Sequence, residues 1–439
     1  MSQRTAATEL AKLLNRNGHL AYFAGGCVRD KLLAREPKDY DIATSATPAQ
    51  VLKLFPGANE VGAHFGVIIA RHAGHHIEIA TFRTDGSYKD GRRPDSVTFS
   101  SPLADAQRRD FTINGLFENP ETGEIIDHVN GLTDLEAKIL RAIGIPTDRF
   151  QEDALRLLRA VRFSTALGFP IEPVTLAALH ENAGLLDKIS PERIRDEFSK
   201  IITHPHRRQG LELLVDTGLI RHFLPEILPL IGCEQPPEWH PEGDVYTHTC
   251  IMLEMLPAHA PLDLCLAVLL HDIAKPPTQT FDDPSGRIRF NGHDTLGAEM
   301  TETILTRLKY PNAVIRDVTH MVSRHMQFMN VRHMRKAKLK RFMSAPTFPR
   351  EMELHRVDCA SSNGFTDNYL FLNEKSAEFS AEPLIPPPLI TGKDLIDLGL
   401  PPGPAFKDLL HQVETEQLEN RLTTREAALQ FITDHLSNP

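Results

Sequence analysis

Residues 21–44 of the chain read AYFAGGCVRDKLLAREPKDYDIAT, and this stretch decides the fold. The short apolar run at residues 19–23 predicts a strand, which the pair Gly25 and Gly26 ends. Glycine has no side chain to keep an anion away from the backbone, so we expect free N–H groups of this pair to cradle a phosphate. Arg29, near the start of the next predicted helix, adds a fixed positive charge.

Two carboxylates follow in the same stretch. If residues 40–43 are extended, Asp39 and Asp41 point to the same face, because side chains alternate along a strand. Two such carboxylates can hold a pair of Mg²⁺ ions about 3.5–4 Å apart, an arrangement used for in-line displacement at phosphorus. An isolated Asp-x-Asp is more often a solvated turn. Next to the glycine pair, it indicates a nucleotidyl-transfer site in which Asp39 and Asp41 are the catalytic metal ligands.

The joint pattern GG-x-VRD followed by DYDIAT resembles the class II tRNA nucleotidyltransferase and bacterial poly(A) polymerase family. That family belongs to the polymerase-beta-like nucleotidyltransferases, and the resemblance implies a small mixed sheet that carries the two aspartates. We therefore expect an α+β protein with a small mixed-sheet head followed by an all-helical neck, an HD domain and a tail. The expected boundaries are 1–148, 149–240, 241–380 and 381–439.

A predicted hairpin and a long polar segment follow the aspartates. Residues 66–82 have β-branched runs on both sides of an Ala-Gly turn. Glu78 alternates with two isoleucines there, so it is either a third metal-site carboxylate or an exposed strand residue. In the resembling family, residues 83–107 correspond to a flexible loop needed to add the terminal adenosine. This loop, with Arg92 and Arg93, speaks against an enzyme that adds only cytidines.

Residues 108–114, RRDFTIN, match a further motif of the family. The match implies that Arg109 and Asn114 clamp the triphosphate and the ribose. This assignment is chemically sound, because guanidinium groups bind phosphate oxygens bidentately. By itself, an arginine pair would be interpreted as a solvated basic surface.

Residues 149–169, RFQEDALRLLRAVRFSTALGF, predict a helix in which Asp153 and Arg156 are neighbours at i and i+3. For an arbitrary sequence, the ordinary interpretation is an ion pair on the helix surface. In the resembling family this motif is an amino-acid template for the incoming base, and Glu152 would orient Arg156. The same segment supplies two further residues assigned to nucleotide binding, Arg159 and Arg162.

The chemistry of the bases agrees with such a template. Cytosine and adenine both present an amino donor beside a ring-nitrogen acceptor, which a carboxylate and a guanidinium complement. Uracil and guanine reverse the pattern, and their buried polar groups would be left unpaired. CTP and ATP are therefore the predicted substrates. Residues 191–202 resemble the family's fifth motif, which would brace the template helix, with Glu192 and Glu197 facing outward.

A second constellation, rich in histidine, begins near residue 246. The adjacent pair His271 and Asp272 follows a leucine-rich helix, with His248 upstream and Asp358 downstream. Any one of these histidines alone would be interpreted as a satisfied polar residue. Together they resemble the HD phosphohydrolase superfamily, and the resemblance implies that these four residues bind a metal. Three further residues are candidate ligands or phosphate contacts: His293, His325 and Lys275.

Imidazole and carboxylate ligands suit a transition metal such as Mn, Ni or Co. A metal-bound water that attacks a phosphoester would give phosphatase or 2′,3′-cyclic phosphodiesterase activity, which would serve the end repair of damaged tRNA.

Composition narrows the functional classes. The chain has 439 residues and a formal net charge of −10, which argues against indiscriminate binding of nucleic acid. Its five cysteines are odd in number and form no C-x-x-C, which suits a reducing compartment. Since no run of about 18 apolar residues occurs, we expect a cytoplasmic protein without a membrane segment.

The predicted function is addition of CCA to tRNA 3′ ends from CTP and ATP, with Mg²⁺ as cofactor. The tRNA would be held mainly through its backbone and shape. Three alternatives remain open at this point. An adenosine-only tRNA nucleotidyltransferase or poly(A) polymerase shares every head motif. A phosphohydrolase could carry the head as a binding module, and an RNA-binding scaffold would have no need of either metal constellation.

Overall fold

The computed structural model describes residues 1–59, 66–86, 96–282, 286–380 and 383–437. The chain forms two compact units. The N-terminal unit comprises Met1–Leu228 and Arg307–Tyr310, and the C-terminal unit comprises Pro229–Thr306 and Pro311–Pro439. Arg92 and Arg93 lie outside the described residues.

The head is built on a six-stranded mixed sheet in the order β3-β4-β2-β1-β7-β8. Strands β2 and β4 are parallel, and the other neighbours are antiparallel. The strands are β1 Ala21–Ala24, β2 Ile42–Thr44, β3 Val67–His72, β4 His75–Thr81, β7 Phe117–Glu118 and β8 Ile125–Ile126. A separate antiparallel pair is formed by β5 Arg83–Asp85 and β6 Val97–Phe99.

Short helices surround this sheet: α1 Gln3–Arg16, α2 Gly26–Leu32, α3 Pro48–Leu54, α4 Pro102–Gln107, a 3₁₀ turn Thr112–Asn114, and α5 Gly131–Glu136. The predicted hairpin is confirmed, since β3 and β4 pair on either side of Ala73 and Gly74. Beneath the sheet, the buried rings of Phe82 and Phe117 meet edge to face with centroids 5.8 Å apart. This contact joins the residue that follows β4 to strand β7.

The rest of the N-terminal unit is helical. It contains α6 Pro146–Glu152, α7 Leu155–Leu167, α8 Pro173–Asn182, α9 Pro191–Ile202 and α10 Arg207–Asp216, with 3₁₀ segments Ala183–Lys188, Leu219–His222 and Pro225–Leu230. Helix α7 packs against α9 and α10. The single helix predicted over residues 149–169 is wrong, because Asp153 has an extended backbone (φ −139°, ψ 101°) that separates α6 from α7.

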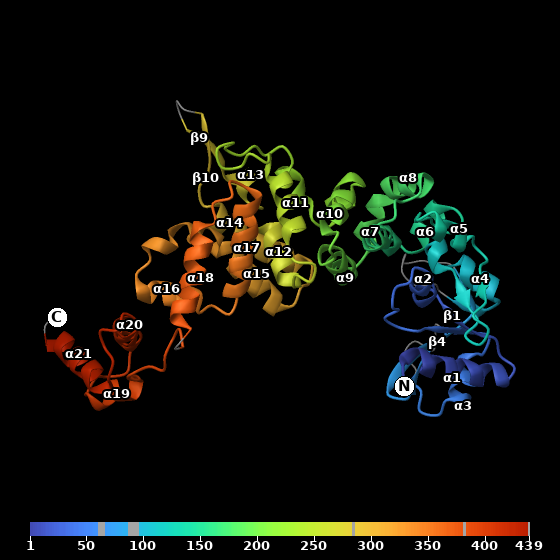
Figure 1. The fold of residues 1–439 in the computed structure, drawn as a ribbon, viewed down its shortest axis with the longest axis horizontal. Coiled ribbons are helices and arrows are strands. Elements are labelled where there is room, and N and C mark those ends of the chain that lie inside the picture. Colours follow the sequence, from blue (N-terminus) through green and yellow to red (C-terminus); the bar gives the residue numbers. More distant parts are fainter. Residues whose placement is uncertain (60–65, 87–95, 283–285, 381–382, 438–439) are drawn as a thin grey trace. The chain divides into compact units, whose positions relative to one another are not determined.

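The C-terminal unit contains the HD domain and the tail. Helices α11 Val245–Met255, α12 Leu262–Leu270, α15 Asn312–Arg324 and α17 Phe348–Ser361 pack together (Figure 1). The other elements are α13 Lys275–Thr278, β9 Gln279–Asp282, β10 Arg287–Phe290, α14 His293–Arg307, a 3₁₀ segment His325–His333, α16 Lys336–Met343 and α18 Asp367–Phe379. The tail consists of α19 Gly392–Asp397, α20 Ala405–Leu418 and α21 Arg425–Ser437.

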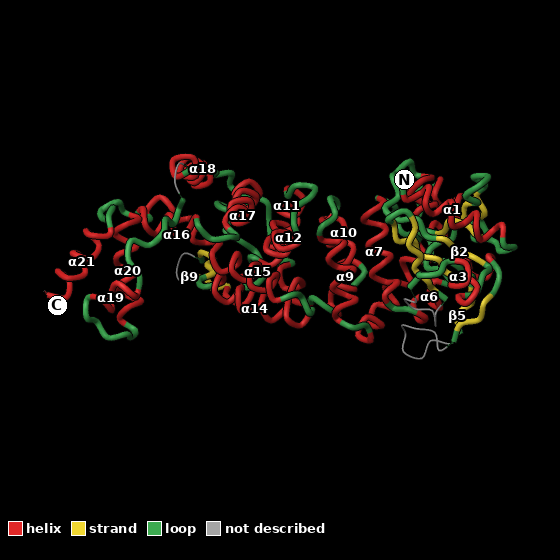
Figure 2. The backbone as a smooth tube through the Cα atoms, turned by 90° about the horizontal axis from the view of Figure 1, so that it is seen from below, coloured by secondary structure: helices red, strands yellow, loops and turns green. Residues whose placement is uncertain are grey.

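Figure 2 shows most of the strands in the head and mainly helices through the rest of the described chain, with β9 as a strand in the HD domain. The predicted fold class is therefore confirmed. Within the described part of the HD domain, the antiparallel pair of β9 and β10 departs from the all-helical expectation.

Candidate active site and metal centre

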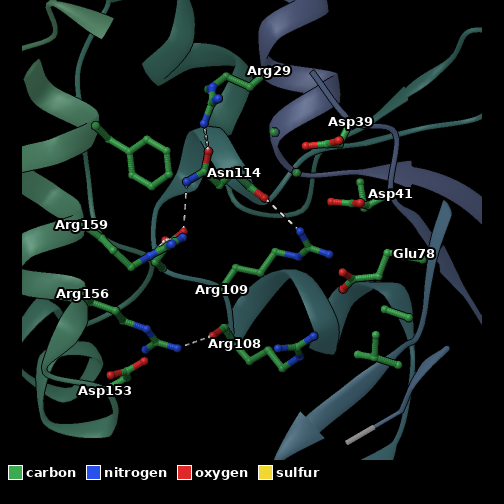
Figure 3. A pocket seen from close by; sticks show the side chains of 18 of the residues that line it. Arg29, Asp39, Asp41, Glu78, Arg108, Arg109, Asn114, Asp153, Arg156 and Arg159 are labelled. Atoms are coloured by element: carbon green, nitrogen blue, oxygen red, sulfur yellow. Dashed lines mark hydrogen bonds and ion pairs between the residues drawn. The ribbon is translucent and has the colours of Figure 1, made fainter. Parts of the chain in front are cut away.

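Three carboxylates gather on one side of a cavity of about 740 Å³ in the head. Antiparallel pairing of β1 with β2 sets their positions, and the Ala24 N–H donates to the Asp41 carbonyl (3.1 Å). Asp39 and Asp41 both line the cavity, as predicted from their spacing, and Glu78 of β4 lies beside them (Figure 3).

The surroundings of the Asp41 carboxyl disfavour its ionised form. Burial, the Glu78 carboxylate and the Asp39 carboxylate together raise its pKa to about 6, and Arg109 only partly opposes them. Oxygen donors crowded in this way suit a hard divalent cation, which would relieve their mutual repulsion. The donor set therefore fits the Mg²⁺ that the family implies, with Glu78 as a third candidate ligand.

The glycine pair plays a different part from the one predicted. The Gly25 N–H is not free, because it donates to the Leu116 carbonyl (3.1 Å). Gly25 has φ +71°, and a Cβ built on it would lie 2.9 Å from Nη1 of Arg109. Glycine is thus required here both for the backbone conformation and for the close approach of a guanidinium, while Gly26 begins α2 and also lines the cavity.

A chain of hydrogen bonds links the predicted nucleotide-binding residues. Arg29 donates to the Asn114 carbonyl oxygen Oδ1 (2.6 Å), and Asn114 Nδ2 donates to Asp110 (3.1 Å). Arg159 Nε donates to the other oxygen of Asp110 (2.9 Å). Although burial would raise the pKa of Asp110, Arg159 and the Asn114 amide hold it at about 2. The buried Asp110 carboxylate therefore positions Asn114 on one side of this network and Arg159 on the other.

Asp105 is a site residue that the sequence analysis missed. Its buried carboxylate accepts from Arg108 Nε (2.9 Å) and from Arg109 Nη2 (3.0 Å). The signal was present, because residues 105–109 read DAQRR and place the acid three and four positions before the two arginines, at helix spacing. Arg108 and Arg109 both line the cavity, so Asp105 holds a pair of cations at its wall.

The template pair does not share one helix: the Arg156 N–H donates to the Asp153 carbonyl (2.9 Å) at the start of α7, and tertiary contacts then hold the two side chains. Arg193 of α9 donates to Asp153 (2.9 Å), 40 residues away in sequence. Arg156 donates to Glu152 (2.6 Å) and to the carbonyl of Arg108 (2.9 Å). The predicted i, i+3 neighbours on one helix are therefore wrong, whereas the predicted contact of Glu152 with Arg156 is confirmed. Asp153 and Arg156 both line the cavity, opposite the three carboxylates (Figure 3).

Helix α9 also anchors Arg162, which donates to Glu197 (2.5 Å). The prediction that Glu197 faces outward is wrong, because only 4% of this residue is exposed. Phe163 was not singled out from the sequence either. Three guanidinium groups lie within 4.0–5.2 Å of its ring centroid, those of Arg29, Arg159 and Arg162. The ring lines the cavity and helps to keep these cations in place.

The C-terminal unit brings all the predicted HD-domain residues into one cluster. His248 Nε2 lies 3.3 Å from an oxygen of Asp358, and His271 Nε2 lies 3.0 Å from an oxygen of Asp272. The other oxygen of Asp272 faces His293 (3.4 Å) and His325 (3.8 Å). Among the described residues, three groups of possible ligand atoms result: His248, His271 and Asp358; Asp272, His293 and His325; and His240, Glu242 and His248, which shares His248 with the first.

The tautomers of these four histidines follow from their second nitrogens. The Nδ1 atoms of His271, His293 and His325 lie 2.6–2.8 Å from backbone carbonyls, which can only accept. His248 Nδ1 lies 2.6 Å from the Glu242 carboxylate, another acceptor that the sequence analysis missed. Each Nδ1 therefore carries a proton, and the Nε2 atoms, which face the carboxylates of Asp272 and Asp358, are the atoms left to bind a metal.

This arrangement fits a metal. The Nε2 atoms of His293 and His325 are only 3.1 Å apart, so their lone pairs repel unless a cation lies between them. Hydrogen bonding of the outer nitrogen to a carboxylate or carbonyl is typical of metal-binding histidines. Lys275, a candidate phosphate contact, instead pairs with Asp272 (2.7 Å) and donates to Gln235 (2.6 Å).

Comparison with known proteins agrees with both sites. Three family models match: the poly A polymerase head domain at residues 21–141, the probable RNA and SrmB-binding site of polymerase A at residues 168–231, and the HD domain at residues 245–357. A mixed-sheet head with this acidic cavity, followed by an HD domain, defines a nucleotidyltransferase of the poly A polymerase class.

The chain belongs to the CCA-adding enzyme family. It is 42% identical over 273 residues to the CCA-adding enzyme of Latilactobacillus sakei, covering 59% of this chain and 68% of that protein. It is 48% identical over 216 residues to the enzyme of Lactobacillus johnsonii, covering 49% of this chain and 54% of that protein. The matched region thus spans about half the length of most of these relatives. The Bacillus stearothermophilus CCA-adding enzyme, solved with CTP, superposes with a TM-score of 0.77 at 26% identity, covering 100% of both chains.

Among the residues that the structure describes, no helix has the length and apolar character needed to cross a membrane. The five cysteines are free thiols.

Replacement of Gly25 by alanine tests its contact with Arg109. An L-residue at positive φ costs about 1–2 kcal/mol, so Gly25→Ala should lower the melting temperature. Gly18→Ala is the matched control, because Gly18 also has positive φ (+82°) but no atom within 4 Å of an added Cβ. Only Gly25→Ala should also weaken binding of inorganic tripolyphosphate, by about tenfold, through displacement of Arg109. Equal affinities in calorimetric titrations of the two variants would contradict this role.

Proposed function

We propose that this chain adds CCA to tRNA 3′ ends, using CTP and ATP and releasing pyrophosphate. The observation that supports the proposal is the head cavity, where three carboxylates lie opposite Asp153 and Arg156 and arginines line the space between. Its relatives are named CCA-adding enzymes, and one was solved in complex with CTP. A cytoplasmic location, where free thiols persist, is part of the proposal.

Asp39 and Asp41, with Glu78 beside them, would hold Mg²⁺. Such ions lower the pKa of an attacking hydroxyl and offset the charge of departing pyrophosphate. Arg29 and Arg109 would bind the triphosphate, and Gly25 and Gly26, at the same wall, would leave room for it to approach the backbone. These groups are already held by buried acids and amides, so little reorganisation is needed when the nucleotide binds.

Base selection would fall to Asp153 and Arg156. The Asp153 carboxylate would accept from the amino group of cytosine or adenine, and Arg156 would donate to the ring nitrogen beside it. Hydrogen bonds to Arg149, Glu152 and Arg108 use three of the five N–H donors of Arg156, which leaves donors for a base. Asn114, Arg159 and Arg162 would complete the nucleotide site through the Asp110 network and Glu197.

Incorporation of labelled CTP and ATP tests this function against its nearest alternatives. The substrates are tRNAs that end at the discriminator base, at CC, or at CCA. We expect two cytidines and then one adenosine, with no addition to the CCA end. Adenosine added only to the CC end would make the protein a tRNA adenylyltransferase, and unlimited adenosine on any RNA end would make it a poly(A) polymerase. No incorporation would favour a binding module or a scaffold.

Arg193 provides a test of the template, because it holds Asp153 without lining the cavity. Arg193→Ala should lower the preference for CTP and ATP over UTP and GTP by about tenfold, equivalent to about 1.4 kcal/mol. Arg195→Ala is the matched control on the same helix, since Arg195 pairs with the half-exposed Asp196 instead. Competition assays with all four nucleotides would measure the effect. If Arg193→Ala retained full selectivity, the bracing of the template would be disproved.

We further propose that the HD centre binds a transition metal (Mn, Ni or Co) and hydrolyses phosphoesters at damaged tRNA ends. His248, His271, Asp272 and Asp358 would be its ligands, with His293 and His325 completing a second group. In the hydrolysis of a 2′,3′-cyclic phosphate, a water oxygen bonds to phosphorus, one P–O bond to the ribose breaks, and the departing ribose oxygen takes a proton.

Metal analysis tests the composition of this centre. Because two of the three groups of ligand atoms share His248, they predict two ions per chain after loading with Ni²⁺, one at His248 and one at Asp272, His293 and His325. Joint replacement of His293 and His325 by alanine should leave one, because only the group around His248 would remain. His333→Ala, an exposed histidine on the same 3₁₀ segment as His325, is the matched control and should retain both. Two ions bound to the double variant would refute the second group of ligands.

A further inference from the structure

The HD centre lies at the base of a cavity of about 670 Å³, which is within the usual size of a small-molecule site. Asp272, His293, His325 and Asp358 line this cavity, so the predicted metal ligands face its interior. Its other walls are largely apolar and include aromatic rings. The phosphoester chemistry proposed above uses only the metal ligands and leaves these walls unexplained.

Two aromatic rings on the walls are exposed. Trp239, the only tryptophan of the chain, is 42% exposed, and Phe365 is 64% exposed. Both line the cavity, together with Phe290 and two methionines, Met326 and Met329. Large rings are normally buried, because each exposed ring keeps a large apolar area in water. Exposure of two of them beside a metal centre indicates a planar ligand that covers them.

The aromatic residues of the walls lie close in sequence to residues of the metal centre or share hydrogen bonds with them. Trp239 lies three residues before Glu242, which binds His248. The carbonyl of Phe290 accepts from His293. Phe365 follows α17, the helix that carries Asp358, and its N–H donates to the Asn363 side chain (3.0 Å). A planar group held by these rings would therefore lie at a set distance from the reacting phosphate.

The cavity wall also carries a positively charged side chain. Arg332 lines the same cavity, its side chain is 49% exposed, and its guanidinium donates to the Asp367 carbonyl (3.0 Å). A cation at the mouth of the cavity suits the negative charge of a phosphate. An aromatic platform, a metal centre and a surface arginine together match the base, the phosphoester and the second phosphate of a nucleotide.

We propose that Trp239 and Phe365 form a nucleobase-binding subsite, so that the HD centre selects ribonucleotide phosphoesters over phosphoesters without a base. This inference rests on the proposed phosphohydrolase function of the same centre. It adds the substrate class and the residues that determine it. The base stacks on the rings, and the ribose phosphate reaches the centre from there.

Tryptophan fluorescence tests binding separately from hydrolysis, because Trp239 is the only source of tryptophan emission. We expect adenosine 2′,3′-cyclic phosphate to quench the emission of the full-length protein and ribose 5-phosphate to leave it unchanged. Phe365→Leu keeps the fluorophore and should weaken the nucleotide affinity about tenfold or more. An affinity unchanged in Phe365→Leu, or no quenching in the wild type, would overturn the subsite.

Hydrolysis provides the second measurement. Trp239→Leu should raise KM for adenosine 2′,3′-cyclic phosphate by about tenfold to hundredfold, and Trp239→Phe, which retains a ring, should stay near the wild-type KM. Neither variant should change KM for glycerol 1,2-cyclic phosphate, which carries the same reacting group without a base. Equal KM changes for both substrates would overturn the inference while the phosphohydrolase function stood. If no substrate were hydrolysed, that function would fail, and the fluorescence result alone would decide the subsite.

The source of the nucleotide is distinguished by comparing the mononucleotide with an oligoribonucleotide that ends in a 2′,3′-cyclic phosphate. A KM at least tenfold lower for the oligonucleotide identifies an RNA end as the ligand, and equal KM values identify a free nucleotide. In both cases the subsite requires that the KM rise in Trp239→Leu.

Discussion

Repulsion among three carboxylates is the constraint on which the head depends. Pairing of β1 with β2 fixes the backbone of Asp41, and β4 brings Glu78 to the same place. Burial of the Asp41 carboxyl, together with the Glu78 and Asp39 carboxylates that the sheet brings near it, raises its pKa to about 6. A site of this kind binds a divalent cation readily, because the cation removes an electrostatic cost that the fold already carries.

On the opposite side of the cavity, several arginines lie close together although their positive charges repel one another. Buried acids hold these arginines in place. Asp105 holds Arg108 and Arg109, Asp110 holds Arg159, and Glu197 holds Arg162. Loss of one partner from a buried pair costs about 3–5 kcal/mol, because the other charge is left buried and unpaired. The intact pair adds little net stability, since both charges have lost their water, and its main effect is to specify where each guanidinium lies. The result is a positive wall that is organised before a nucleotide arrives.

The HD centre positions its histidines with backbone carbonyls and one carboxylate. Backbone carbonyls accept from the outer nitrogens of three of its histidines, and Glu242 accepts from the fourth. These acceptors sit beside the elements that also shape the cavity walls, such as Phe290 on β10. At Phe290, therefore, the same residue orients a histidine of the centre and forms part of the cavity wall.

By itself, the sequence determined the local elements and the residue types at both sites. The strand before Gly25, the alternation of Asp39 and Asp41, the hairpin that carries Glu78 and the pair His271–Asp272 all follow from spacing within a few residues, and spacing of that kind is set by backbone geometry. Tertiary structure decided the partners. Arg193 reaches Asp153 from 40 residues away, and the Leu116 carbonyl takes the Gly25 N–H that the sequence suggested was free. Glu197 is buried because Arg162 lies across from it on another helix. Such pairings depend on how helices and strands pack in space, and the periodicity of one segment carries no record of which distant segment will cover it.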